Sequence, residues 1–184
     1  KTLRNEGIEI SIFTGNHDMW MYNYFTEEYG IKVYKQPAIF EIDGHQFFIG
    51  HGDGLGPGDF QYKFVKKIFS SRVAQKLFSM IHPTPALNIM KSISQRDAKK
   101  YTRPDDFKPE KEWLIQYSQE HTIKFPEISY YIFGHRHLVY DYEINGGARV
   151  LNLGDWISYF SYAEWDGQQL QMKFYREPEK TVHV

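Results

Sequence analysis

The sequence predicts an α+β fold for a chain of 184 residues. Short β-branched and aromatic runs are typical of strands, and they alternate with segments in which apolar residues recur every three or four positions, as in amphipathic helices. Three predicted strands lead into polar segments that begin with glycine: GNHD at residues 15–18, GHGD at 50–53 and GHRH at 134–137. Loops at strand ends can converge on one cleft, so this repeated placement predicts a shared functional site.

Composition is that of a globular protein, with 41% hydrophobic and 17% aromatic residues. We expect a single domain over residues 1–184, with residues 59–103 inserted as a helical lid. The absence of cysteine excludes a disulfide framework, a thiolate nucleophile and a cysteine-based zinc site. No run approaches the ~18 apolar residues that indicate a membrane span. We therefore expect a cytoplasmic protein.

The first half of the chain contains mainly strands. Asp43-Gly44 is the dipeptide of a tight hairpin turn, and Gly30 is placed to end a helix. The predicted elements are a strand at residues 7–13, a helix at 19–29, and hairpin strands at 38–42 and 45–49.

The second half begins with helices and ends with strands. Apolar residues at helical spacing predict one helix over residues 60–81, and Pro83 and Pro85 separate it from another. The predicted elements are helices at residues 60–81 and 86–100, a helix opened by Pro109, a strand at 130–133, and a meander of antiparallel strands at 139–144, 149–153, 163–165 and 170–175.

Charge is unevenly distributed along the chain. Residues 60–103 carry ten lysines or arginines against one acidic residue, whereas the rest of the chain carries 12 basic and 22 acidic residues. A basic segment of this kind meets an anionic partner or forms a solvated helix face. The first interpretation predicts contact with phosphate or with an anionic membrane surface.

The donor groups in the three polar segments indicate metal binding. Imidazole nitrogens and an amide oxygen suit a borderline divalent ion such as Mn, Fe, Co or Zn better than Ca or Mg. A His-x-His pair alone is weak support, because a solvated turn can carry two histidines.

In this order, the three segments resemble the conserved blocks of the calcineurin-like metallophosphoesterase family. That resemblance implies a four-layer αββα sandwich that hydrolyses phosphoesters with two divalent metal ions, Mn being the expected one. It assigns Asn16, His51 and His135 to one metal and His137 to the other. It also implies that His17 is catalytic, contacting the phosphoryl or leaving-group oxygen. Asp18 and Asp53 are expected to anchor their loops.

The family's first two blocks, Asp-x-His and Gly-Asp-x-x-Asp, do not precede Gly15 in this sequence. We therefore expect that the N-terminal βαβ portion of the fold, which supplies further metal ligands, is missing from this chain. If no such portion exists, the resemblance implies an inactive scaffold that binds protein through the lid.

The basic helical segment and the GDW sequence at residues 154–156 resemble bacterial UDP-2,3-diacylglucosamine pyrophosphatases of lipid A biosynthesis. This resemblance implies hydrolysis of UDP-2,3-diacylglucosamine to UMP and 2,3-diacylglucosamine 1-phosphate, with no nucleic-acid partner and with peripheral contact at the inner face of the inner membrane. His17 stands where those enzymes often have arginine, which favours the alternative of a general phosphodiesterase or phosphomonoesterase.

The lid would determine specificity. Its apolar stripe is either plain packing against the body of the domain or a surface for acyl chains. On the second interpretation, an apolar inner face with a basic rim suits a lipid that carries a diphosphate. The residues expected to bind substrate are Phe64, Lys67, Ile68, Phe69, Arg72, Leu77, Phe78 and Ile81.

Overall fold

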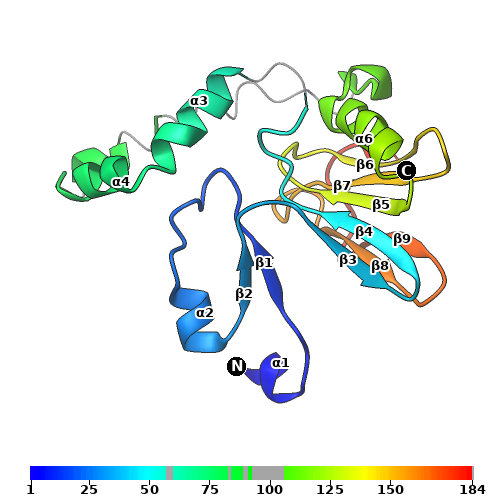
Figure 1. Ribbon diagram of the computed structural model, residues 1–184, viewed down its shortest axis with the longest axis horizontal. Coiled ribbons are helices and arrows are strands. Elements are labelled where there is room, and N and C mark those ends of the chain that lie inside the picture. Colours follow the sequence, from blue (N-terminus) through cyan, green and yellow to red (C-terminus); the bar gives the residue numbers. More distant parts are fainter. Residues whose placement is uncertain (57–59, 83, 89–90, 93–105, 184) are drawn as a thin grey trace. The chain divides into compact units, whose positions relative to one another are not determined.

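The computed structural model describes residues 1–56, 60–82, 84–88, 91–92 and 106–183 (Figure 1). It consists of two compact units: Lys1–Lys35 with Gly58–Tyr101, and Gln36–Pro57 with Thr102–Val184. Within the described residues, no helix is both long and apolar enough to span a membrane. Part of the expected lid lies outside the described residues, so a single domain with an inserted lid stays a prediction.

The first unit contains a small β-α-β arrangement after the short helix α1 (Thr2–Asn5). Strand β1 (Ser11–Phe13) pairs in parallel with β2 (Lys32–Tyr34), and α2 (Tyr24–Tyr29) connects them. The predicted strand 7–13 is therefore shorter than expected, and strand β2 was not predicted.

The predicted helix 19–29 begins only at Tyr24. A turn occupies the residues before it, in which the N–H of Met21 donates to the carbonyl of Asp18 and Tyr22 has a positive φ of 48°. Helical backbone cannot pass through a residue in that conformation. Gly30 ends the helix with a φ of 62°, as its position in the sequence predicted.

The predicted helix 60–81 is two helices, α3 (Phe60–Phe69) and α4 (Arg72–Ser79). The break occurs because Ser71 adopts an extended backbone and its hydroxyl accepts the N–H of Ala74, which starts a new helix. The predicted helix 86–100 falls largely outside the described residues.

Trp20 joins these helices to the segment after β1. Its indole N–H donates to the carbonyl of Phe69 at 2.7 Å, and its ring contacts Phe69 and Phe78 at centroid distances of 6.0 and 5.2 Å. The carbonyl of Phe69 also accepts the side-chain amide of Gln75 at 3.0 Å. The α3–α4 junction is thereby attached to the loop that carries His17.

The second unit is built on a five-stranded mixed sheet with the order β3-β4-β5-β7-β6. Strands β4, β5 and β7 run parallel to one another, while β3 and β6 are antiparallel at the two edges. The strands are β3 (Ala38–Ile42), β4 (His45–Ile49), β5 (Ile128–Phe133), β6 (Val139–Glu143) and β7 (Arg149–Leu153).

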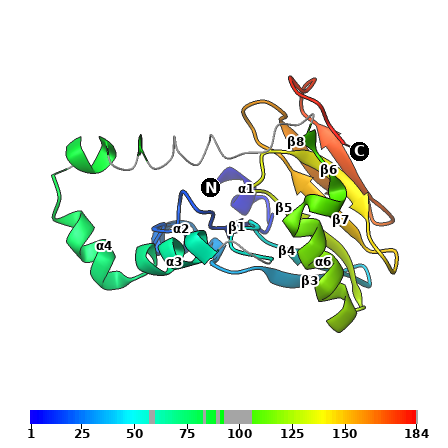
Figure 2. The same ribbon diagram turned by 90° about the horizontal axis from the view of Figure 1, so that it is seen from above.

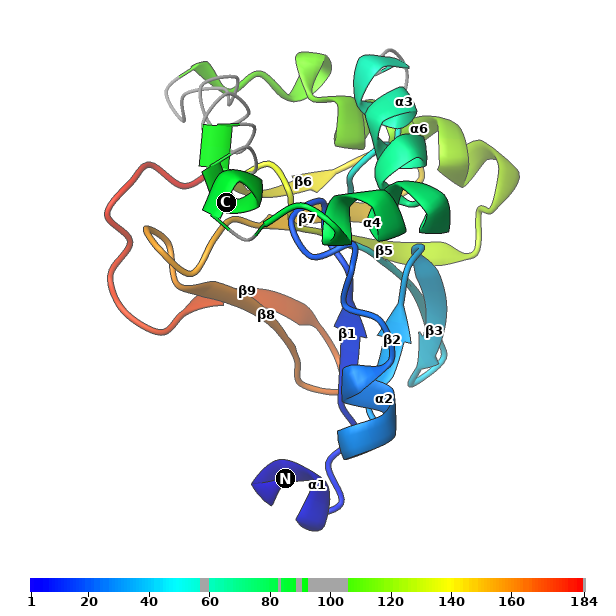
Figure 3. The same cartoon turned by 90° about the vertical axis from the view of Figure 1, so that its left-hand side faces the viewer.

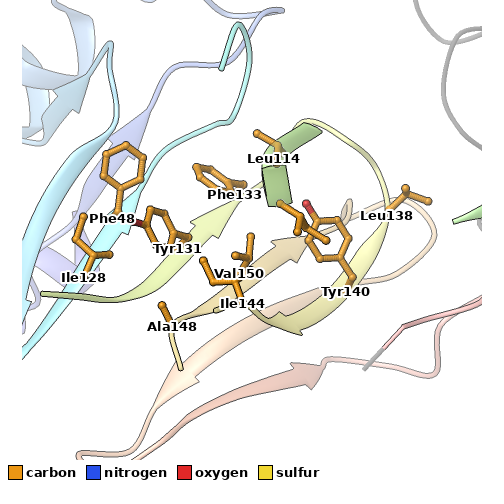
Figure 4. Packing of buried hydrophobic residues seen from close by; sticks show 11 residues of the cluster. Phe48, Leu114, Ile128, Tyr131, Phe133, Leu138, Tyr140, Ile144, Ala148 and Val150 are labelled. Atoms are coloured by element: carbon orange, nitrogen blue, oxygen red, sulfur yellow. The ribbon is translucent and has the colours of Figure 1, made fainter. Parts of the chain in front are cut away.

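The sheet lies between two other layers of this unit (Figures 2 and 3). One face, with Phe48, Tyr131 and Val150, packs against helix α6 (Trp113–Lys124), as Figure 4 shows. The opposite face packs against a hairpin of β8 (Ser161–Trp165) and β9 (Leu170–Phe174). The α+β class is confirmed, and this unit has a helix–sheet–sheet order of layers.

Two further predictions about this unit were wrong in detail. The helix that Pro109 was expected to open, through Trp113, Leu114 and Tyr117, is present as α6 but begins only after Glu112, which is extended; Pro109 opens a separate 3-10 turn, Pro109–Lys111. The predicted C-terminal meander is two separate hairpins, since β7 pairs with β5 and β6 but not with β8. Positive φ values at Gly154 and Phe160 turn the chain between the two sheets.

The half-buried side chain of His121 predicts a pH dependence of stability. Its ring lies between Phe48 and Phe125, at centroid distances of 4.8 and 4.5 Å, and burial, with a contribution from Lys124, lowers its pKa below 6.5. The unfolded chain then binds more protons than the folded one as the pH falls below about 6.5, so stability is lost on acidification. In urea titrations between about pH 7 and pH 5, His121→Gln should lose less unfolding free energy than the wild type.

The matched control is His82→Gln, which replaces an exposed histidine in the segment after α4. It should follow the wild-type pH dependence. If the unfolding free energies of His121→Gln and the wild type change equally with pH, His121 does not contribute to the loss of stability on acidification.

Candidate metal centre

Three loops of the second unit leave the sheet on the same side, at the carboxyl ends of its parallel strands. Strands β4, β5 and β7 are parallel neighbours, and the segments after them contain His51, His135 with His137, and Asp155. The carboxyl ends of parallel strands form the usual ligand-binding edge of such a sheet. The fold thus brings two of the three polar segments together with the GDW segment.

Hydrogen bonds to main-chain carbonyls connect these loops to one another. The N–H of Gly134 donates to the carbonyl of His51 at 3.0 Å, and the side-chain amide of Asn152 donates to the carbonyl of Gly134. Asn152 is fully buried on β7. These hydrogen bonds therefore connect the three strand ends directly.

The imidazoles of His51 and His135 are neighbours, with ring centroids 5.1 Å apart. His135 is 9% exposed, and its burial, together with the nearby His51, lowers its pKa from 6.5 to about 3. The ring is therefore neutral at physiological pH, which is the form that binds metal ions.

His137 is oriented by a carboxylate. Its Nδ1 lies 3.2 Å from Oδ2 of Asp155, and the other oxygen of Asp155 accepts the N–H groups of Ile157 and Ser158. Burial raises the pKa of Asp155, but these hydrogen bonds and His137 outweigh it, so the pKa lies below its usual value. A carboxylate at Nδ1 presents the Nε2 lone pair outward, as in metal-binding histidines.

The GHRH turn has an unusual backbone. His135 and His137 have positive φ values of 66° and 50°, and the N–H of Arg136 donates to the carbonyl of Gly134 at 2.7 Å. Left-handed backbone costs a non-glycine residue on the order of 1–3 kcal/mol, and it persists only where the surroundings hold it.

Glu112 and Trp113, at the start of α6, contact this turn. The guanidinium Nε of Arg136 lies 2.9 and 3.1 Å from the two oxygens of Glu112, and the group sits 4.6 Å from the Trp113 ring. Sequence reasoning missed Glu112, because nothing in its local pattern connects it to a residue 24 positions later.

The other predicted metal ligand and the catalytic residue lie in the first unit. Asn16 and His17 occupy the loop after β1, where the carboxylate of Asp18 accepts the N–H of Gly15. Asp18 thus anchors its loop as expected. Convergence of Asn16 with the histidines of the second unit stays a prediction.

The predicted substrate-binding residues on α3 and α4 fall into two groups. Phe69 and Phe78 contact Trp20 and are half-buried. The others are exposed: Phe64, Lys67, Ile68, Arg72, Leu77 and Ile81. Their role in substrate binding also stays a prediction.

Within the part of the chain that the structure describes, no group of three or more His, Asp or Glu side chains is placed to hold a metal ion. The second unit nonetheless supplies donors that fit one: a neutral histidine beside another histidine, and a third histidine oriented by a carboxylate. Nitrogen donors of this kind suit Mn, Fe, Co or Zn.

Comparisons with known proteins give two informative relatives, while no protein-family model matches the sequence. The chain is 35% identical over 196 aligned residues to the UDP-2,3-diacylglucosamine hydrolase of Porphyromonas gingivalis, covering 96% of this chain and 72% of that protein. It is 31% identical over 94 residues to the enzyme of the same name from Proteus mirabilis, covering 51% of this chain and 39% of that enzyme.

Among solved structures, zinc-bound Vps29 from Entamoeba histolytica matches with a TM-score of 0.40 and 12% identity. The match covers 92% of this chain and 63% of the Vps29 chain.

Asp155→Asn tests whether the carboxylate orients His137. The amide preserves the shape but not the charge that fixes the imidazole, so Mn²⁺ affinity should fall by about 10–100-fold. Calorimetric titration of the metal-free protein measures it.

Asp166→Asn is the matched control, because Asp166 also accepts two N–H groups in a turn, those of Gln168 and Gln169, but lies between β8 and β9. It should retain wild-type metal affinity. An unchanged affinity in Asp155→Asn would argue against an orienting role.

Proposed function

Because the chain belongs to the family of UDP-2,3-diacylglucosamine hydrolases, we propose that it hydrolyses the phosphoanhydride of UDP-2,3-diacylglucosamine in lipid A biosynthesis. The products are UMP and 2,3-diacylglucosamine 1-phosphate. The observation that carries the proposal is the pair His51 and His135, whose rings are neighbours at the carboxyl ends of parallel strands, with burial keeping His135 neutral and with His137 in the same turn as His135.

Two divalent metal ions, Mn being the first candidate, form the proposed cofactor. Asn16, His51 and His135 would hold one ion, and His137 would contribute to the other. When bound, such ions neutralise charge on the phosphoryl oxygens and make water a competent nucleophile near neutral pH. The donor chemistry of the three histidines fits this role.

The protein's own side chains then orient the reaction. His17 contacts the phosphoryl or leaving-group oxygen and stabilises the charge that develops there. The oxygen of water bonds to one phosphorus, and the bond from that phosphorus to the bridging oxygen breaks. The bridging oxygen departs with the second phosphate, and the proton of the water passes to solvent.

Exposed apolar and basic residues on α3 and α4 support a lipid substrate. Phe64 and Leu77 are 66% and 62% exposed, and Lys63, Lys67 and Lys76 lie on the same two helices. Apolar side chains with a basic rim suit acyl chains joined to a diphosphate and permit peripheral contact with an anionic membrane. The proposal therefore places the protein at the cytoplasmic face of the inner membrane.

A general phosphoesterase is the second candidate, favoured by histidine at position 17 where these hydrolases often have arginine. Such an enzyme has no use for an exposed apolar surface beside a basic rim. The two candidates therefore differ in their response to acyl chains.

Substitutions of two histidines separate metal binding from catalysis in the complete gene product. His135→Ala should remove bound metal and activity together, because it deletes a ligand. His17→Ala should leave metal bound while lowering kcat by about 10²–10⁴-fold. Metal content by mass spectrometry and turnover of UDP-2,3-diacylglucosamine are measured on each variant.

His82→Ala, which replaces an exposed histidine outside the three polar segments, is the control and should resemble the wild type. Loss of metal in His17→Ala would assign that residue to the metal site instead.

Acyl-chain length tests the lipid substrate. Each buried methylene contributes ~0.8 kcal/mol, so shortening both chains by four carbons should lower kcat/KM substantially. Phe64→Ala should reduce kcat/KM for the long-chain substrate more than for the short-chain one. Ile123→Ala, on α6 and 82% exposed, should leave that ratio unchanged.

A generic chromogenic phosphodiester is assayed beside these substrates. A flat response to chain length, or faster turnover of the generic compound, would favour the general phosphoesterase.

A further inference from the structure

A buried ion pair lies between the two histidines of the GHRH turn and the start of α6. The side chains of Arg136 and Glu112 are only 10% and 3% exposed, and the guanidinium Nε contacts both carboxylate oxygens, at 2.9 and 3.1 Å. Contact with both oxygens fixes the direction of the arginine side chain. Arg136 is thereby tied to a residue outside its own loop.

The indole of Trp113 completes the arrangement. It lies 4.6 Å from the guanidinium of Arg136, and it stacks on the imidazole of His135 with a centroid distance of 6.1 Å and an interplanar angle of 25°. One ring therefore contacts both Arg136 and a predicted metal ligand. Adjacent residues at the start of α6 thus hold two consecutive residues of the turn.

The backbone of the turn requires such support. His135 lies between the carbonyl of Gly134 and the N–H of Arg136, which bond at 2.7 Å, and its φ is 66°. A three-residue turn with positive φ at its centre is a rare and strained form. His137 also has a positive φ, of 50°. Because Arg136 lies between the two histidines, fixing its side chain restrains both of them.

A simple contribution to stability explains this ion pair poorly. Burying two charges costs desolvation energy, and replacing a buried pair with apolar residues is often neutral or stabilising. The geometry that the pair imposes on the strained turn explains it better. A variant that removes both charges should therefore change metal binding while leaving the melting temperature nearly unchanged.

We propose that Glu112 and Trp113 are positioning residues that set the directions of His135 and His137 for metal binding. Glu112 acts through Arg136, and Trp113 acts through Arg136 and through its own contact with His135. The assignment rests on the proposed function in that the histidines are taken as metal ligands. It adds that the start of α6, remote in sequence from all three polar segments, belongs to the catalytic apparatus.

The test compares three variants of the complete gene product. Arg136→Lys keeps the charge but loses the planar fork, Glu112→Gln removes one charge, and the double variant Glu112→Gln with Arg136→Met removes both. Each should bind Mn²⁺ about 10–100-fold more weakly and lower kcat more than it changes KM. The double variant should retain a melting temperature near that of the wild type, because it leaves no unpaired buried charge.

Asp141→Asn is the matched control. Asp141 also pairs with an arginine, Arg149, in a partly buried contact on the same sheet but away from the histidines. It should alter the melting temperature while leaving Mn²⁺ affinity within about twofold, since it touches no ligand.

Metal-free protein provides a readout that does not depend on activity. The Cε1–H resonances of His135 and His137 in the double variant should shift from their wild-type positions, whereas those in Asp141→Asn should not. Unchanged resonances, Mn²⁺ affinity and kcat in a folded double variant would overturn the proposal. A wild type that binds Mn²⁺ without cleaving UDP-2,3-diacylglucosamine would instead overturn the proposed function.

Discussion

Parallel pairing of β4, β5 and β7 is the constraint on which the candidate site depends. Parallel neighbours must begin and end at the same edges, so the segments after them leave together, whatever lies between them in sequence. Because of this pairing His51 meets His135, and Asp155 reaches His137. An antiparallel β7 would place Asp155 at the opposite edge and leave His137 without its carboxylate.

Both faces of the sheet must be covered for its central strands to be buried. Helix α6 covers one face and the β8–β9 hairpin covers the other. Glu112 immediately precedes the helix that buries Tyr131 and Val150, so packing the core places a carboxylate beside the GHRH turn. Gly52 shows how close this fit is, since an added Cβ would lie 3.2 Å from the side chain of Leu114. The packing of α6 against the sheet thus determines both the core and the position of Glu112 beside the candidate site.

Sequence patterns predicted most strands of the second unit because runs of apolar residues and turn dipeptides determine strands through residues close together in the sequence. The hairpin at Asp43-Gly44 has the expected bounds, and both turn residues have positive φ. Patterns failed where the deciding interaction was not local. A helical period runs through residues 60–81, yet Ser71 caps a new helix there. The parallel partner of β7, and the pairing of Glu112 with Arg136, depend on the assembled sheet and left no signal in either segment.

The positive φ values at His135 and His137 also restrict how the proposed metal site can change in evolution. Asparagine, aspartate and histidine are the non-glycine residues most enriched in that conformation, whereas β-branched and bulky residues are outliers. Substitutions that preserve the turn therefore exchange an imidazole nitrogen for a carboxylate or amide oxygen. Oxygen donors favour harder ions than imidazole does. The two backbone angles thus bias any inherited change of metal preference toward harder ions such as Mg or Ca and away from soft metals that bind thiolates.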